Sequence, residues 1–448
     1  MKLNYKRTFF IGLAFLSICA FWQMYDNIIP LMLQQTFHLN ETITGVIMAL
    51  DNVLAVFLLP LLGNLSDKLD TSLGKRTPFV IVGTILACAL LLLLNVANNK
   101  ASLGFFIATL FLLLIAMGLY RSPAVALMPD LTPKPLRSQG NAVINLMGAL
   151  GGVYALILIA LFSPKEGTDY TTILIGIVII MALAVVVLVI TIREKKLIPE
   201  VEKENKWWEE NRNTTDRETA AAHTRDKDAV TKGASSASNS AVDPSDPAVK
   251  RSLSFILISI AFWFMAYNAV TTAWSRYAIT VWNMQGGGYA NCLMVGTVAA
   301  CISYIPVGII ASRIGRKKTI LIGVVMLFIS YFAAGMYGQF SASINFFFVL
   351  IGIGWAAINV NSLPMVVEMC DETQVGKYTG LYYTFSMSAQ IVTPILSGAL
   401  LQYVSYRSLF PYACVFTVAA FITMCMVRHG DNRPEVKTNK LEYLDVDD

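Results

Sequence analysis

Charged residues are scarce in this sequence. Only 14% of its 448 residues are Asp, Glu, Lys or Arg, whereas 56% are hydrophobic. Soluble domains usually contain about 25% charged residues. A soluble globule with the present composition would expose a large apolar surface to water. The composition therefore excludes a large soluble catalytic domain and favours a protein embedded in a membrane.

Residues that carry metal or nucleotide chemistry are also few. The chain has 3 His and 7 Cys, and no cysteine has the spacing of a metal site. The sequence contains no nucleotide-binding loop and no Ser/His/Asp arrangement. We therefore expect no cofactor, no metal and no enzymatic activity. The net charge of +5 comes from basic residues in short loops, so nucleic acid is not an expected partner.

Long hydrophobic runs take up most of the chain. Twelve membrane-spanning helices of about 20 residues each would use about 240 residues. The sequence predicts an all-α membrane protein of twelve transmembrane helices in two pseudo-symmetric six-helix bundles, residues 1–192 and 251–428. The expected spans are 8–34, 43–63, 78–97, 103–128, 141–162, 171–192, 252–280, 290–311, 319–338, 343–367, 380–402 and 408–427.

Residues 193–250 separate the two sets of six spans. This stretch of 58 residues carries 11 Lys and Arg and 12 Asp and Glu. It cannot bury a core, so we expect a flexible linker, with a short surface helix at 200–212 as the alternative. Lys and Arg concentrate in the loops on the linker's side, which predicts a cytoplasmic location for the linker, the N-terminus and the tail 429–448. The short loops opposite favour a bacterial inner membrane.

The two halves repeat weakly. Segments 60–79 and 306–320 both run from Pro and Gly to a basic cluster before the next helix. Segments 122–141 and 362–381 correspond in the same way. Parallel six-helix halves predict a substrate site between them, near the middle of the bilayer.

The loop after the second span carries a motif formed by Gly63, Ser66, Asp67, Lys68, Gly74, Lys75 and Arg76. This motif resembles the signature of the major facilitator superfamily. Segments 60–79 and 126–132 look like the sucrose–proton symporter branch, and 364–380 looks like the glycoside–pentoside–hexuronide cation symporters, which include melibiose permease. The resemblance implies transport of a saccharide or glycoside coupled to a cation.

The chain departs from these families at their known cation sites. Ala55 and Leu59 stand where the melibiose-permease type has paired aspartates, and Arg121 stands where it has an aspartate in the fourth helix. The acid of the plant sucrose type falls near Leu114. Coupling is therefore expected to use other acids.

The resemblance also implies a cytoplasmic gate. Asp67 is expected to cap or pair near a helix end of the other half, and the basic residues are expected to latch the cytoplasmic face in the outward-open state. The expected gate residues are Asp67, Lys68, Lys75, Arg76, Asp130, Arg137, Arg313, Arg316, Glu368 and Asp371.

Three ionisable residues lie well inside apolar runs: Asp26, Asp51 and Arg121. A charge in the hydrocarbon region is costly unless it is paired or hydrated, so such residues are functional candidates. We expect a contact of Arg121 with Asp51 or Asp26 that changes during transport and couples it to protons. A static buried ion pair and an Arg121 that binds an anionic substrate are the alternatives. Arg276 is expected to snorkel into an interfacial aromatic belt.

Sugars need an aromatic face and hydrogen-bonding side chains. The first span gathers five such residues between positions 22 and 27, and single candidates lie in other spans. The predicted substrate contacts are Trp22, Gln23, Tyr25, Asn27, Asn52, Tyr120, Asn145, Asn268, Trp355, Asn359, Asn361 and Gln390.

The sequence thus predicts a monomeric secondary transporter that takes up a disaccharide or glycoside with a proton by alternating access. A transporter of an amphipathic or anionic solute is one alternative. A membrane sensor that does not transport is the other.

Overall fold

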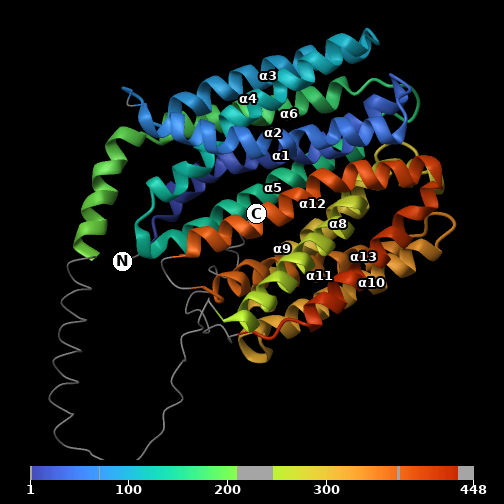
Figure 1. Ribbon diagram of the computed structural model, residues 1–448. Coiled ribbons are helices and arrows are strands. Elements are labelled where there is room, and N and C mark those ends of the chain that lie inside the picture. The colour runs from blue at the N-terminus through green and yellow to red at the C-terminus, as the bar shows by residue number, and fades with distance from the viewer. Residues whose placement is uncertain (1–2, 70, 209–245, 371–373, 432–448) are drawn as a thin grey trace, which may run out of the picture.

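The computed structural model describes residues 3–69, 71–208, 246–370 and 374–431, and it shows a bundle of long helices (Figure 1). Twelve helices in this part of the chain are long and apolar enough to cross a membrane, as the sequence predicts. They are α1 (Tyr5–Gln35), α2 (Glu41–Lys68), α3 (Thr77–Asn99), α4 (Leu103–Asp130), α5 (Arg137–Phe162), α6 (Thr171–Thr191), α8 (Pro247–Trp282), α9 (Gly288–Ile314), α10 (Arg316–Met336), α11 (Ile344–Val367), α12 (Val375–Tyr403) and α13 (Leu409–Cys425).

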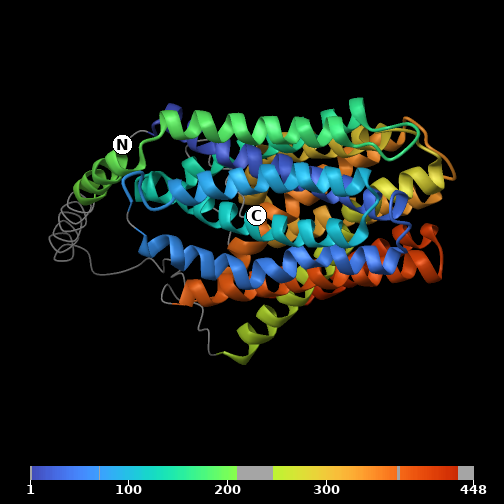
Figure 2. The ribbon, with the colours of Figure 1, turned by 90° about the horizontal axis from the view of Figure 1, so that it is seen from above.

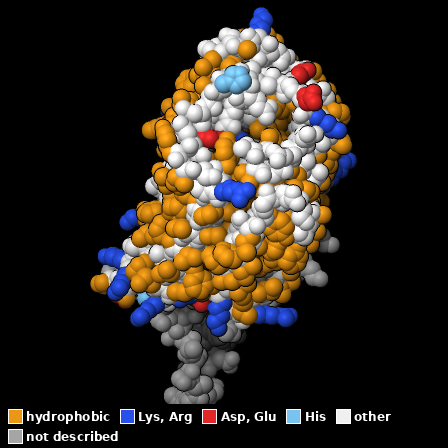
Figure 3. All heavy atoms as spheres, turned by 90° about the vertical axis from the view of Figure 1, so that its right-hand side faces the viewer, with side chains coloured by type: hydrophobic (Ala, Val, Ile, Leu, Met, Phe, Trp, Pro, Cys, Tyr) orange, Lys and Arg blue, Asp and Glu red, His pale blue; other side chains and the backbone are white. Residues whose placement is uncertain are grey.

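The helices form because every backbone polar group inside a bilayer needs a partner within the protein, and a helix supplies it locally. Asn4 and Asn40 begin α1 and α2 as N-caps, accepting hydrogen bonds from the backbone N–H of Arg7 and Ile43. Large apolar side chains such as Phe57 and Ile302, each 70% exposed, remain on the outside of the bundle. Hydrophobic side chains cover its flanks in Figure 3, as expected of a surface that faces lipid.

The helices form two halves. In the N-half (α1–α6), α1 packs against α5 and α6, and α4 packs against α2 and α3. In the C-half (α8–α13), α11 packs against α9 and α10, and α13 packs against α8 and α10. The halves meet through α2 with α12, α5 with α9, and α1 with α8. In Figure 1, α5 of the N-half and α12 of the C-half lie where the two halves meet.

The bundle has two ends, and the one that carries the N-terminus is called the terminal end. At this end, on the left of Figures 1 and 2, α1 begins at Tyr5, α3 at Thr77 and α10 at Arg316. At the far end, α1 ends at Gln35 and α2 begins at Glu41. Figure 3 looks onto the far end.

The start of the expected linker is ordered as a helix. Residues 194–208 are helical and overlap the short helix that the sequence offers as the alternative at 200–212, and α8 already begins at Pro247. Leu197 and Ile198 pack against the hydrophobic core, and Asn205 accepts a hydrogen bond from the backbone N–H of Lys134. The rest of the linker, 209–245, lies outside the described residues, as does the tail beyond 431.

Glu194 joins this helix to the N-half. Its carboxylate is fully buried and accepts hydrogen bonds from the backbone N–H groups of Lys75, Arg76 and Thr77, and from the Thr77 hydroxyl. The carboxylate thus caps the positive end of α3. Gly74 makes room for it, because a Cβ at this position would lie 2.4 Å from the Glu194 carboxyl group. Sequence reasoning missed Glu194, since it lies in a run of mixed charges.

Candidate functional site

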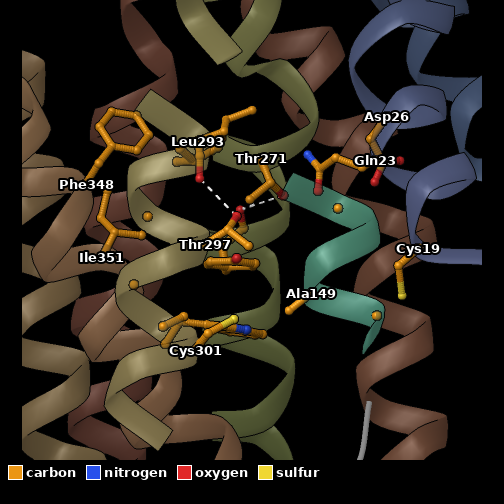
Figure 4. Close-up of a pocket in the computed structure, with 18 of the residues that line it drawn as sticks. Cys19, Gln23, Asp26, Ala149, Thr271, Leu293, Thr297, Cys301, Phe348 and Ile351 are labelled. Carbon is orange, nitrogen blue, oxygen red and sulfur yellow. Dashed lines mark hydrogen bonds between the residues drawn. The ribbon is translucent and has the colours of Figure 1, made fainter. Parts of the chain in front are cut away.

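A cavity lies between the halves, midway along the helices. It consists of two adjoining spaces of about 330 and 360 Å³ that share Cys19, Asp26, Tyr267, Asn268, Thr271 and Trp355 as lining residues. Small-molecule sites usually occupy about 300–1,000 Å³. Figure 4 shows Gln23 and Asp26 on α1 facing the C-half, where Thr271, Thr297 and Cys301 line the opposite wall. The cavity lies where the repeat of the two halves predicts a substrate site.

The charged residues of the cavity all come from the N-half. Asp26 on α1, Asp51 on α2 and Arg121 on α4 line the same space. Asp51 accepts a hydrogen bond of 2.8 Å from the side chain of Asn52. The Arg121 guanidinium lies over the Trp22 indole, 5.8 Å from the ring centre. The described residues show no ion pair of Arg121 within 4.0 Å, so in this conformation the cation rests on an aromatic face.

The C-half contributes an aromatic wall. The ring of Tyr267 on α8 stacks on the Trp355 indole on α11, with ring centres 3.7 Å apart and planes 7° apart. Phe264 contacts the same indole edge-on at 5.2 Å. This packing fixes Trp355 against the cavity and presents a rigid apolar surface with polar neighbours, Asn268 and Asn359.

Several buried polar atoms at the cavity have no hydrogen-bond partner within the protein. These are the indole N–H of Trp22, the amide nitrogen of Asn268 and the amide oxygen of Asn27. A buried polar group without a partner is costly, so such atoms are expected to meet water or a ligand. They include both donors and acceptors, as a ligand with hydroxyl groups requires.

The structure brings most of the predicted substrate contacts to the cavity, but not all of them. Tyr25 packs against Phe21 and Trp22 in the core of the N-half. Tyr120 is buried and donates a hydrogen bond to the Ala14 carbonyl, and the amide of Asn361 donates to the Ala357 carbonyl. The residues that do line it are Trp22, Gln23, Asn27, Asn52, Asn145, Asn268, Trp355, Asn359 and Gln390. Tyr25, Tyr120 and Asn361 lie on the same helices as cavity residues, but their side chains make contacts within the N-half or the C-half and do not line the cavity.

Thr271, Thr272 and Ser386 also line the cavity and were missed, because single hydroxyl residues in a membrane helix carry no distinctive pattern. No group of three or more His, Cys, Asp or Glu side chains that could hold a metal ion occurs in the part of the chain described.

Five of the predicted gate residues form ion pairs at the terminal end, each within its own half. Arg76 contacts Asp67 at 2.5 Å and Asp130 at 2.9 Å, all in the N-half. Asp67 therefore pairs here with its own half and not with a helix end of the other half. Burial lowers the pKa of Arg76, but Asp130 and Asp67 outweigh it and raise the pKa above its usual value. In the C-half, Arg316 contacts Glu368 at 2.9 Å.

Among the remaining predicted gate residues, Asp371 lies outside the described residues. The side chains of the others are exposed at the terminal end: Lys68, Lys75, Arg137 and Arg313.

The sequence prediction for Arg276 is wrong. It does not snorkel into an aromatic belt: it is 4% exposed, and its guanidinium contacts the Glu41 carboxylate at 3.0 Å. Glu41 belongs to the N-half, so this ion pair joins the two halves at the far end. No sequence pattern reveals this ion pair, because its two partners are far apart along the chain.

Comparisons with known proteins agree with this architecture. A sequence model described as Major Facilitator Superfamily matches residues 11–296 and 282–443. The sucrose transport protein SUT3 of rice, Oryza sativa subsp. indica, is 27% identical over 138 residues. The chain matches only 27% of the length of that relative, and the match covers 27% of this chain.

Solved structures share the fold at low sequence identity. The nucleoside transporter NupG superposes with a TM-score of 0.67 and 14% identity, covering 95% of this chain and 100% of that one. The human organic anion transporter MFSD10 (TETRAN) gives 0.57 and 15%, covering 95% of this chain and 100% of that one. With the family match over nearly the whole sequence and twelve spans in the described residues, the chain belongs to the major facilitator superfamily and is a multi-pass membrane protein.

Proposed function

We propose that this transporter takes up a disaccharide or glycoside together with a proton by alternating access. The observation that carries the proposal is the composition of the central cavity. One wall holds Asp26, Asp51 and Arg121, and the opposite wall holds the Tyr267–Trp355 stack with amides. The partial similarity to a rice sucrose transport protein supports the same substrate class.

The cavity suits a neutral hydroxylated ring. The C–H face of a sugar packs on aromatic surfaces, and its hydroxyl groups both donate and accept hydrogen bonds. Trp355 supplies the surface, and the unpartnered atoms of Trp22, Asn27 and Asn268 supply donors and an acceptor. Asn145, Asn359 and Gln390 add amides around the same space.

Proton coupling would depend on the distance between Arg121 and the acids. A guanidinium close to a carboxylate favours its charged form, whereas a carboxylate in an apolar site without such a partner favours protonation. Arg121 lies over Trp22 in this conformation. Its movement toward Asp51 would release a proton, and its withdrawal would allow protonation. This exchange, coupled to the movement of the halves, would link the proton gradient to transport.

The proposal places the terminal end in the cytoplasm, because Lys and Arg concentrate there. The present conformation is then closed toward the outside. Arg76 and Arg316 pair with acids of their own halves at this end. The charged residues there would form the latch between halves only when the cavity opens outward.

The test is to add saccharides to energy-depleted cells that express the protein and to record the external pH. The panel contains sucrose, maltose, other glucosides and galactosides, with empty-vector cells as the control. Alkalinisation with one sugar class is expected, since a symported proton leaves the medium. No pH change with any sugar, despite confirmed surface expression, would overturn the proposal.

Arg121 supports a second candidate. Because no carboxylate of the described residues lies within 4.0 Å of it, its guanidinium is placed to bind an anionic group of a substrate. Competition between the recognised sugar and its carboxylated analogue separates the two functions. An anionic substrate would lose affinity in Arg121→Gln, whereas a neutral sugar would lose mainly accumulation.

A further inference from the structure

The two halves meet at the far end through a buried ion pair. Glu41 begins α2 in the N-half, and Arg276 lies near the end of α8 in the C-half. Their carboxylate oxygen and guanidinium nitrogen are 3.0 Å apart, and each side chain is only 5% exposed. Both charges have therefore lost most of their contact with water, and each depends on the other for compensation.

Polar contacts around the pair also cross between the halves. The Tyr406 hydroxyl of the C-half donates a hydrogen bond to the Glu41 carboxylate. The backbone N–H and the hydroxyl of Thr42 both donate to the side-chain oxygen of Gln402, at 3.1 and 2.5 Å. Four residues from α2, α12 and the turn after α12 thus converge on one point of the interface.

The backbones themselves come close beside the ion pair. A Cβ at Gly45 on α2 would lie 2.1 Å from the Pro394 carbonyl oxygen on α12. A Cβ at Gly398 on α12 would lie 2.6 Å from the Glu41 carbonyl oxygen. The halves can approach this closely only because both positions are glycine. The far end is therefore closed by packing as well as by charge.

We propose that Glu41 and Arg276 form the outer gate of the transporter. This inference rests on the proposed alternating access and orientation. The ion pair holds the far end closed while the cavity faces the cytoplasm, and it separates each time the cavity opens outward. In the open state both side chains reach water, so each tolerates the loss of its partner there but not in the closed state.

Removing one partner should therefore favour the outward-open state. Glu41→Gln leaves a buried guanidinium without a counter-charge, and Arg276→Gln leaves a buried carboxylate. Both changes destabilise the closed far end and leave the open one nearly unchanged. The cavity should then be reached from outside much more often.

The experiment uses Cys19 as the reporter, because it lines the cavity. All other cysteines are replaced by serine, and intact cells are treated with a membrane-impermeant maleimide. Glu41→Gln and Arg276→Gln are each expected to raise the labelling rate by about tenfold or more, as loss of one partner of a buried ion pair allows. Glu166→Gln and Lys100→Gln are the controls, because they remove the same charges at exposed far-end positions away from the ion pair. Both variants should label at the parent rate.

The charge-reversed double variant Glu41→Arg with Arg276→Glu distinguishes the loss of the ion pair from a folding defect. It should label more slowly than either single glutamine variant, since the pair is restored in reverse. Labelling of both single variants at the parent rate would overturn the gate. Labelling requires neither a sugar nor a proton gradient, so a chain that labels as expected but moves no sugar keeps the gate and loses only the proposed substrate.

Discussion

The ring of Tyr267 lies parallel to the Trp355 indole, with 3.7 Å between the ring centres. The two side chains come from α8 and α11, and together they form the aromatic wall of the cavity. Their stacking restricts the indole before any ligand binds, so little side-chain freedom remains to be lost on binding.

Trp355→Ala should weaken substrate binding. The loss of a large aromatic contact at a binding site is expected to raise the apparent KM of uptake by about tenfold, equivalent to about 1.4 kcal/mol. Trp355→Phe keeps part of the surface and should have a smaller effect. The measurement is the concentration dependence of uptake of the recognised sugar. An unchanged KM in Trp355→Ala would remove the aromatic wall from the substrate site.

Asp51→Asn should uncouple transport. The amide cannot carry a proton or respond to the approach of Arg121, so accumulation driven by a pH gradient is expected to disappear, while exchange of internal for external sugar continues. Both are measured in proteoliposomes with labelled sugar. Asp169→Asn, an exposed acid in the loop before α6, is the control. Full accumulation by Asp51→Asn would exclude this carboxylate from coupling.

Glu194→Ala should destabilise the N-half. It removes the acceptor of three backbone N–H groups at the start of α3 and of the Thr77 hydroxyl. Leaving such buried donors unpaired costs about 1–3 kcal/mol. The variant should therefore unfold at a lower temperature in detergent. Glu200→Ala, at an exposed position of the same helix, should leave the Tm unchanged. Equal Tm values for both variants would show that the cap contributes nothing.

Gly45→Val should prevent closure of the far end. The added side chain would overlap the Pro394 carbonyl, which belongs to the backbone and cannot rotate away. External labelling of Cys19 should rise and sugar uptake should fall to background. Gly104→Val is the control, because a Cβ at Gly104 meets no atom within 4 Å. Normal uptake by Gly45→Val would mean that the far end does not need this close contact.

The candidate site could be predicted only in part from the sequence. Asp26, Asp51 and Arg121 are recognisable from the sequence as unusual charges of the membrane region, and the structure puts all three on one cavity. Trp22 and Tyr25 belong to one polar and aromatic cluster of the sequence, yet only Trp22 lines that cavity. The rotation of a helix about its axis decides this difference, and that rotation depends on packing against neighbouring helices.

The sequence by itself determined the twelve spans and their division into two sets of six, because the need to satisfy backbone groups in lipid acts locally along the chain. Only the tertiary structure decided which charges meet. Arg276 pairs with Glu41 of the other half, Arg76 pairs with Asp67 and Asp130 of its own half, and Glu194 caps α3. An ion pair is a short-range relationship in space between residues distant along the chain, so it exists only once the helices have packed.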